Sequence, residues 1–160
     1  MATSLDLARS ISDRCTCLRL RSAARSMTRQ YDHELRELDL RLTQLTVLVG
    51  VAMFGDSGAP VSALADAVGM ERTTLTRNLK PLAARRWLSS SADRGDLRSR
   101  RITLTKKGEL LLAKAYPLWQ RAQASTERAL GEHNRTLSRV LDEVLGTRSS
   151  RADTGDSATL

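Results

Sequence analysis

The sequence predicts a mainly α-helical fold with one short β-hairpin, and three observations support this prediction. Apolar residues recur three or four positions apart over most of the 160-residue chain, which is the spacing of amphipathic helices. Five residues are aromatic, so the core must consist mainly of Leu, Ala and Val, which suits packed helices. Two short strand-forming segments flank a turn at residues 93–96.

A long helix is expected over residues 8–38, with an Arg-rich face opposite an apolar stripe. The stripe consists of Cys17, Leu20, Ala24, Met27, Tyr31, Leu35 and Leu38. A second helix is expected to begin at Thr43, whose hydroxyl suits an N-cap, and to run to Met53. The Gly-, Ser- and Pro-containing segment 55–60 ends it.

Two more helices should follow, separated by a tight turn. Ser62 is expected to cap the first, which ends at Gly69, and the next begins near Glu71. Pro81 should kink this last helix, and residues 83–86 should complete it. Its buried stripe is Leu75, Leu79 and Leu82, and its outward face consists of Arg72, Thr73, Thr74, Thr76, Arg77 and Lys80.

A basic hairpin comes next, with strands expected at residues 87–91 and 100–104 and Arg94 nearest the tip. Helix, tight turn, helix and two-stranded hairpin together predict a winged helix-turn-helix. A helix fits the major groove of B-DNA, where short polar and Arg side chains reach base edges. A basic hairpin beside that helix can follow the backbone or enter the minor groove.

The charge distribution agrees with this interpretation. Residues 60–110 carry 11 Lys and Arg against 5 Asp and Glu, a net charge of +6 out of +8 for the whole chain. Double-stranded DNA is the expected partner, because neutralising phosphates supplies most sequence-independent affinity. The alternatives are an ordinary solvated basic face and a winged helix used only for protein contacts.

Thr105 is expected to cap another long helix, which runs to about Leu130. A last helix carries the apolar residues Leu137, Val140, Leu141, Val144 and Leu145. Residues 147–160 have little to bury and should form a disordered tail.

Two segments resemble the MarR family of bacterial transcriptional regulators. Residues 96–108 (DLRSRRITLTKKG) match the family's wing pattern DxRxxx[IV]xLTxxG at every defined position, and residues 73–77 (TTLTR) match its recognition-helix pattern. The similarity extends over about residues 14–145, although Arg86 stands where the family usually has Gly. The wing Asp and Arg of the family correspond to Asp96 and Arg98. Asp96 either orients an arginine or simply forms the turn.

The resemblance implies a homodimer that binds a pseudo-palindromic operator, and in some members a small aromatic or phenolic ligand. The corresponding division is an N-terminal dimerisation helix at 1–41, a winged-helix DNA-binding region at 42–104, and C-terminal dimerisation helices at 105–146. Two-fold symmetry then requires half-sites about 10 bp apart, with the wing at residues 92–99 over the flanking minor groove.

The segment from Cys17 to Tyr31 is also similar to the first helix of the family's organic-hydroperoxide-sensing repressors. Cys17 matches their sensing cysteine, and Tyr31 matches the tyrosine that contacts it. A buried apolar cysteine and a metal ligand are the alternatives. On one intact helix Cys15 and Cys17 would point about 200° apart, so they could not pair there.

No catalytic motif, metal-ligand spacing, phosphate loop, signal-peptide core or membrane-length apolar run is evident. The sequence therefore predicts no enzyme, no cofactor and no membrane contact, and a cytoplasmic, nucleoid-associated bacterial protein with reduced cysteines. The predicted function is a DNA-binding transcriptional regulator, as a dimeric repressor released by a small ligand. The alternatives are a redox-sensing repressor using Cys17, and an interaction module or antirepressor that does not bind DNA.

Overall fold

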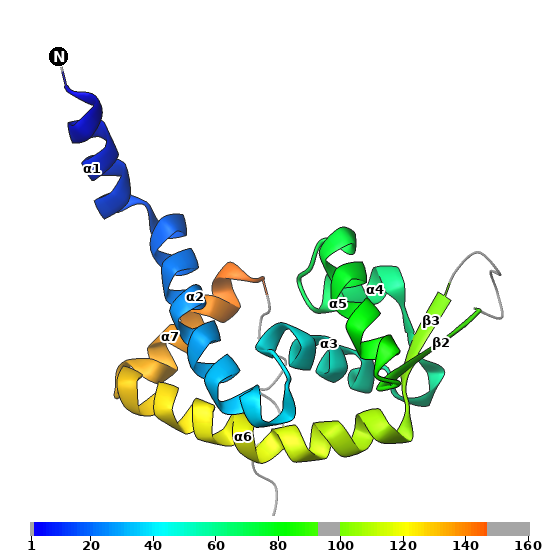
Figure 1. Ribbon diagram of the computed structural model, residues 1–160. Helices are drawn as coiled ribbons and strands as arrows, with labels where there is room; N and C mark the ends of the chain where they lie inside the picture. The colour runs from blue at the N-terminus through cyan, green and yellow to red at the C-terminus, as the bar shows by residue number, and fades with distance from the viewer. Residues whose placement is uncertain (1, 93–99, 147–160) are drawn as a thin grey trace, which may run out of the picture. The chain divides into compact units, whose positions relative to one another are not determined.

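The structure, a computed structural model, describes residues 2–92 and 100–146. The chain divides into two units, Met1–Gln123 and Ala124–Leu160. The first unit holds five α-helices, two 3-10 turns, a small sheet and most of a sixth helix (Figure 1). Its helices are α1 (Ser4–Arg14), α2 (Thr16–Leu35), α3 (Leu42–Met53), α4 (Val61–Ala67), α5 (Arg72–Ala84) and the part of α6 (Lys106–Leu130) up to Gln123.

The expected helix over residues 8–38 is not one helix, and this prediction was wrong. It is broken at Cys15, whose backbone is extended (φ −77°, ψ 104°), and it ends in the 3-10 turn η1 (Arg36–Leu38). Within α2 the predicted stripe is buried at Tyr31 and Leu35, and it is exposed at Leu20 and Ala24. The stripe therefore contacts the core of its own chain at one end.

The helix α1 begins earlier than predicted, because Thr3 forms a capping box with Asp6. The Thr3 hydroxyl accepts a hydrogen bond from the Asp6 backbone N–H at 3.2 Å, and the Asp6 carboxylate accepts from the Thr3 backbone N–H at 3.0 Å. The hydrogen bonds from the Thr3 side chain and backbone also lower the pKa of the Asp6 carboxyl. None of the residues of α1 is buried.

The helix α3 begins at Leu42, so the prediction of an N-cap at Thr43 was wrong. The Leu42 backbone N–H donates to the carboxylate of Asp32 at 2.6 Å, and the Arg41 N–H donates to the Gln44 side chain at 3.0 Å. A carboxylate at a helix N-terminus satisfies a free donor and suits the positive end of the helix dipole. The cap therefore comes from α2, ten residues earlier in the chain.

A short turn joins α4 to α5, as the sequence predicts. Gly69 lies in this turn with φ +62°, a conformation that favours glycine. The N-cap of α4 is Pro60 rather than the predicted Ser62. The helix α5 ends at Ala84, and Arg86 has φ 58°, so residues 85–86 do not complete it as expected. Arg86 thus adopts a left-handed conformation that favours glycine.

The hairpin consists of β2 (Leu88–Ala92) and β3 (Arg100–Leu104), which pair antiparallel with Ser90 opposite Ile102. A third strand, β1 (Ala59–Pro60), pairs with the other edge of β3, so the sheet order is β1-β3-β2. The sequence analysis missed β1, because two residues cannot show the alternation of a strand.

The junction between β3 and α6 is closely packed. Thr105 accepts a hydrogen bond from the Gly108 N–H at 3.1 Å, which confirms it as the predicted cap, and donates to the Arg86 carbonyl at 2.6 Å. A Cβ on Gly108 would overlap the backbone carbonyl of Trp87. The glycine is therefore required by the close approach of α6 to the start of the hairpin.

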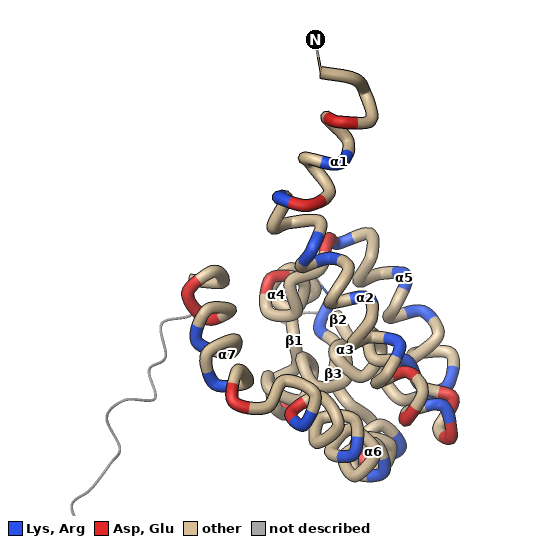
Figure 2. Tube along the Cα trace, turned by 90° about the vertical axis from the view of Figure 1, so that its left-hand side faces the viewer, with Lys and Arg blue, Asp and Glu red and all other residues tan. Residues whose placement is uncertain are grey.

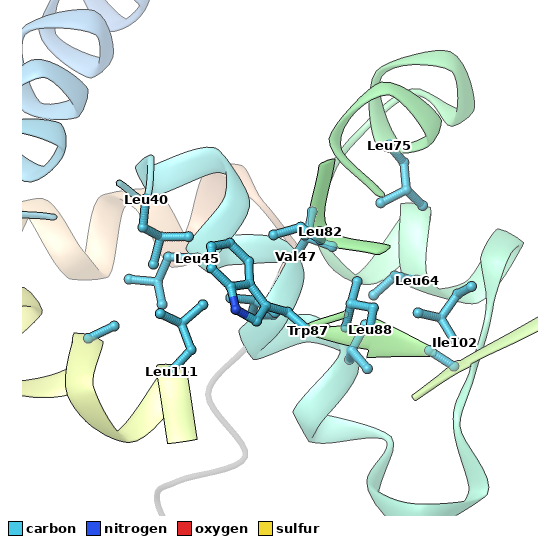
Figure 3. Packing of buried hydrophobic residues seen from close by; sticks show 14 of the residues in the cluster. Leu40, Leu45, Val47, Leu64, Leu75, Leu82, Trp87, Leu88, Ile102 and Leu111 are labelled. Atoms are coloured by element: carbon cyan, nitrogen blue, oxygen red, sulfur yellow. The ribbon is translucent and has the colours of Figure 1, made fainter. Parts of the chain in front are cut away.

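The core of the first unit is one cluster built from its helices and sheet. Leu48, Leu64, Leu75 and Leu82 have no exposed surface, and Trp87 is 7% exposed. Figure 3 shows Trp87 among leucines that come from different parts of the chain. This shared core fixes α5 and the hairpin in one body.

The second unit contains the end of α6 and α7 (His133–Val144). The predicted apolar residues of the last helix lie on one side of α7, and none of its residues is buried in the single chain. In residues 2–92 and 100–146, no helix has both the length and the apolar composition needed to cross a bilayer.

Candidate nucleic-acid interface

The two faces of α5 differ sharply in burial. Leu75 and Leu82 have no exposed surface and Leu79 is half-buried, which confirms the predicted core stripe. The six residues of the outward face are all exposed: Arg72, Thr73, Thr74, Thr76, Arg77 and Lys80. The helix repeat of 3.6 residues places Thr73, Arg77 and Lys80 almost opposite the leucines.

The outward face carries positive charge only. The helix α5 contains three cationic residues and no Asp or Glu, and Figure 2 shows Lys and Arg recurring along it. Across the described residues, the side chains of Arg72, Arg77 and Lys80 form no ion pair with the rest of the chain. Their charges are therefore available to an external anion.

Local hydrogen bonds hold two polar side chains of α5 in place. The Thr76 hydroxyl donates to the Arg72 carbonyl at 2.8 Å, and the Asn78 amide donates to the Thr74 carbonyl at 2.9 Å. Both contacts keep the side chain close to the helix surface, and the Thr76 oxygen retains lone pairs that can accept a further hydrogen bond.

Two arginines of the hairpin hold the sheet together. The Arg100 guanidinium donates to the Ser90 hydroxyl at 2.7 Å and to the Ser90 carbonyl at 3.2 Å. Arg101 donates to the carbonyls of Ser57 and Gly58 at 2.9 and 2.8 Å, which ties β3 to the segment before β1. The predicted wing residues Arg94, Asp96 and Arg98 lie outside the described residues.

Arg85, at the C-terminal end of α5, has contacts that its sequence context did not predict. Its guanidinium forms an ion pair with Asp39 and donates to the Asp39 carbonyl at 3.1 Å. It also lies over the Trp87 ring, 4.9 Å from the centroid. Arg85 and Asp39 are 46 residues apart, so no local pattern could reveal the pair. The contact joins the end of α5 to the segment between α2 and α3.

Solved structures share the fold of this chain. The M. tuberculosis transcriptional regulator MosR, solved in complex with DNA, is 35% identical to this chain and superimposes with a TM-score of 0.73. The match covers 83% of this chain and 95% of MosR. MarR of E. coli, solved with operator DNA, is 21% identical with a TM-score of 0.75, over 84% of this chain and 97% of that one.

The chain belongs to the MarR family of transcriptional regulators. A curated relative, the uncharacterized HTH-type transcriptional regulator YybA of Bacillus subtilis (strain 168), is 29% identical over 126 residues. That match covers 76% of this chain and 80% of YybA. No family model matches the sequence. The predicted winged-helix fold of a DNA-binding transcriptional regulator is confirmed.

The redox candidates of this MarR-family chain are not brought together. Cys17 is exposed and Cys15 is half-buried, whereas the Tyr31 ring is buried and its hydroxyl donates to the Gln123 side chain at 2.5 Å. Fourteen helical residues separate Cys17 from Tyr31 by about 21 Å. The assumption that Cys15 and Cys17 share an unbroken helix was wrong, because the break falls on Cys15.

The first unit also contains an open groove of about 1410 Å³ between α3, β3 and α6. Most of the residues that line it are apolar. Its size exceeds the usual range of closed small-molecule cavities, so part of it is open to solvent. In the described residues, no group of three or more His, Cys, Asp or Glu is placed to hold a metal ion.

Proposed function

We propose that this MarR-family protein is a homodimeric repressor that binds a specific operator with the outward face of α5 in the major groove. The hairpin segment 92–99 would then lie over the flanking minor groove. The exposed, uniformly cationic and polar outward face of α5 carries the proposal, because Arg and Thr side chains at helix spacing suit base edges and phosphates. The DNA complex of MosR supports it by similarity.

The dimer is proposed from apolar surface that the single chain leaves exposed at both of its ends. In α7 the exposed fractions are 44% for Val140, 37% for Leu141 and 69% for Val144. In α1, Leu5 and Ile11 are 57% and 60% exposed. Helices this short are marginal in water alone, so a second copy is needed to bury these faces. A two-fold dimer would read half-sites about 10 bp apart.

Release by a small ligand is proposed from the groove between α3, β3 and α6. The groove is lined by residues of α3 and α6, and α3 also packs on α5. A ligand that binds one arrangement of these helices more tightly than another shifts the population toward it. The spacing of the two α5 helices in a dimer would change in response.

A selection of genomic fragments by the purified protein, followed by a mobility shift at two salt concentrations, tests the DNA-binding part. The expected result is enrichment of pseudo-palindromic sites whose affinity falls as salt rises. A protein-interaction module or antirepressor would enrich no fragment and would leave all DNA unshifted.

A thiol switch at Cys17 is the second candidate function, and the exposure of Cys17 beside the helix break favours it. Peroxide would oxidise the Cys17 thiolate to a sulfenic acid and would itself be reduced to water or an alcohol. A second cysteine thiol would then attack the sulfenic sulfur and form a disulfide, with release of water. A disulfide near this break would change the path from α1 to α2, and with it the dimer. In this version oxidation, rather than ligand binding, releases the operator.

A further inference from the structure

The groove between α3, β3 and α6 has an unusual charge for this protein. Two of its lining residues are charged, Asp56 and Glu109, and both are acidic. Among the residues that the structure describes, the lining includes no Lys, Arg or His. The whole chain nevertheless carries a net charge of +8. The groove is therefore an acidic and apolar surface on a strongly basic protein.

The two carboxylates differ in their surroundings. Asp56 lies in the 3-10 turn η2 (Gly55–Ser57) and is exposed. Glu109 lies in the first turn of α6, and its side chain is half exposed and pairs with Lys106 at 2.8 Å. Lys106 itself does not line the groove. Asp56 thus presents an exposed carboxyl group that forms no ion pair with the other described residues, whereas the carboxyl group of Glu109 is paired with Lys106.

Two stacked aromatic rings form part of the same wall. Tyr116 and Trp119, one turn apart on α6, have ring centroids 5.8 Å apart and planes 22° from parallel. Tyr116 is 57% exposed, so the pair has a face open to a ligand. Aromatic faces attract planar rings by offset stacking and attract cations through the ring quadrupole, for which Trp is the strongest partner.

These features point to one ligand class, and we propose that the groove binds an aromatic organic cation, such as a planar aryl ring that carries an ammonium group. The aryl ring would stack on Tyr116 and Trp119 or enter the apolar floor near Leu45 and Val49, and the ammonium group would face Asp56. An aromatic acid would place its carboxylate beside two carboxylates, with no Lys, Arg or His among the described lining residues to balance it, which costs free energy. The proposal rests on the ligand-released function above and narrows the expected small aromatic or phenolic ligand to an aromatic cation.

Calorimetry with three naphthalene probes, one cationic, one neutral and one anionic, tests the proposal on the full chain without DNA. The probes are 2-naphthylmethylammonium, neutral 2-naphthol and 2-naphthoate, at pH 7. The cation should bind at least about tenfold more tightly than the naphthoate, which corresponds to the strength of one favourable cation contact. Equal binding of the anion and the cation, tighter binding of the anion, or binding of none of the three would overturn the proposal.

Variants identify the groups responsible. Asp56→Asn should lower the affinity for the cation several-fold and leave the affinity for 2-naphthol unchanged. Glu109→Gln should also lower the affinity for the cation, by a smaller factor. Glu71→Gln removes the same charge from an exposed position outside the lining, and it should leave all three probes unaffected. An unchanged cation affinity in both Asp56→Asn and Glu109→Gln would contradict the assignment.

Mobility shifts on the selected operator separate this proposal from the proposed function. If the protein binds its operator but the cation does not bind the protein, the ligand class is wrong and the DNA-binding function stands. If the cation binds in the groove and no DNA is selected, the ligand class stands and the DNA-binding function is wrong. Release of the operator by the cation, and not by the naphthoate, is the result that both proposals together predict.

Discussion

The guanidinium of Arg85 binds both the carboxylate and the backbone carbonyl of Asp39, and so joins the last turn of α5 to the segment that precedes α3. Asp39 adopts a left-handed conformation, with φ 49°, which turns its carbonyl toward α5. The pair thus connects two segments that lie 46 residues apart in the chain.

Replacing Arg85 should cost more stability than removing the charge of Asp39. The ion pair is substantially exposed, with side chains 41% and 82% accessible, so Asp39→Asn should lower the free energy of unfolding by less than about 1 kcal/mol. Arg85→Met also loses the carbonyl bond and the contact with Trp87, and should cost about 1–2 kcal/mol. Urea denaturation measures both, and equal losses would show that the ion pair alone matters.

Replacing Arg86 with glycine should stabilise the protein. Arg86 has φ 58°, where a side chain costs about 1 kcal/mol and Gly costs nothing, partly offset by the greater freedom of Gly in the unfolded chain. Arg86→Gly should therefore add about 0.5 kcal/mol to the free energy of unfolding. Ala84→Gly is the matched control, because Ala84 is the last residue of the right-handed helix α5. This change should lower the free energy of unfolding by up to about 1 kcal/mol. A less stable Arg86→Gly protein would refute this explanation.

These backbone features show where sequence reasoning succeeds and where it stops. The Leu75 and Leu82 stripe and the Thr105 cap follow from residue spacing and local hydrogen bonding, so both could be predicted. The cap of α3 by Asp32 and the pairing of Arg85 with Asp39 depend on the folded chain bringing separate segments together. The helix break at Cys15 could not be predicted, because no glycine or proline lies there. Strand β1 is too short to show the alternation of apolar and polar residues.

Removing the last helix should abolish the dimer. Deletion of residues 131–160 removes α7, and should give monomers or aggregates because the proposed interface then lacks the exposed apolar residues of that helix. Deletion of residues 149–160 alone is the control, and the truncated protein should still have the molar mass of two of its own chains. Light scattering distinguishes the two, and a soluble dimer after the larger deletion would argue against this interface.

If thiol chemistry regulates the protein, Cys17 should matter more than Cys15. Cys17 is exposed to peroxide whereas Cys15 is half-buried at the helix break. Cys17→Ser should keep its DNA affinity and lose release by peroxide, and Cys15→Ser should behave nearly as the wild type does. Mobility shifts with and without peroxide measure this. A wild-type protein that peroxide does not release would leave ligand binding as the signal.

The affinity and site preference of Arg77→Ala on the selected operator test the central claim most directly. Arg77 lies on the outward face of α5, opposite the buried leucines, so its removal should leave the free energy of unfolding unchanged. If Arg77 contacts a base, the variant should lose about 1–3 kcal/mol of binding free energy and should relax the preference at one base pair. Arg98→Ala, at a position that the sequence predicts to lie in the wing, should also weaken binding, and Arg135→Ala, on α7, should not. An Arg77→Ala protein with wild-type affinity and wild-type site preference would contradict the assignment of α5 as the DNA-reading helix.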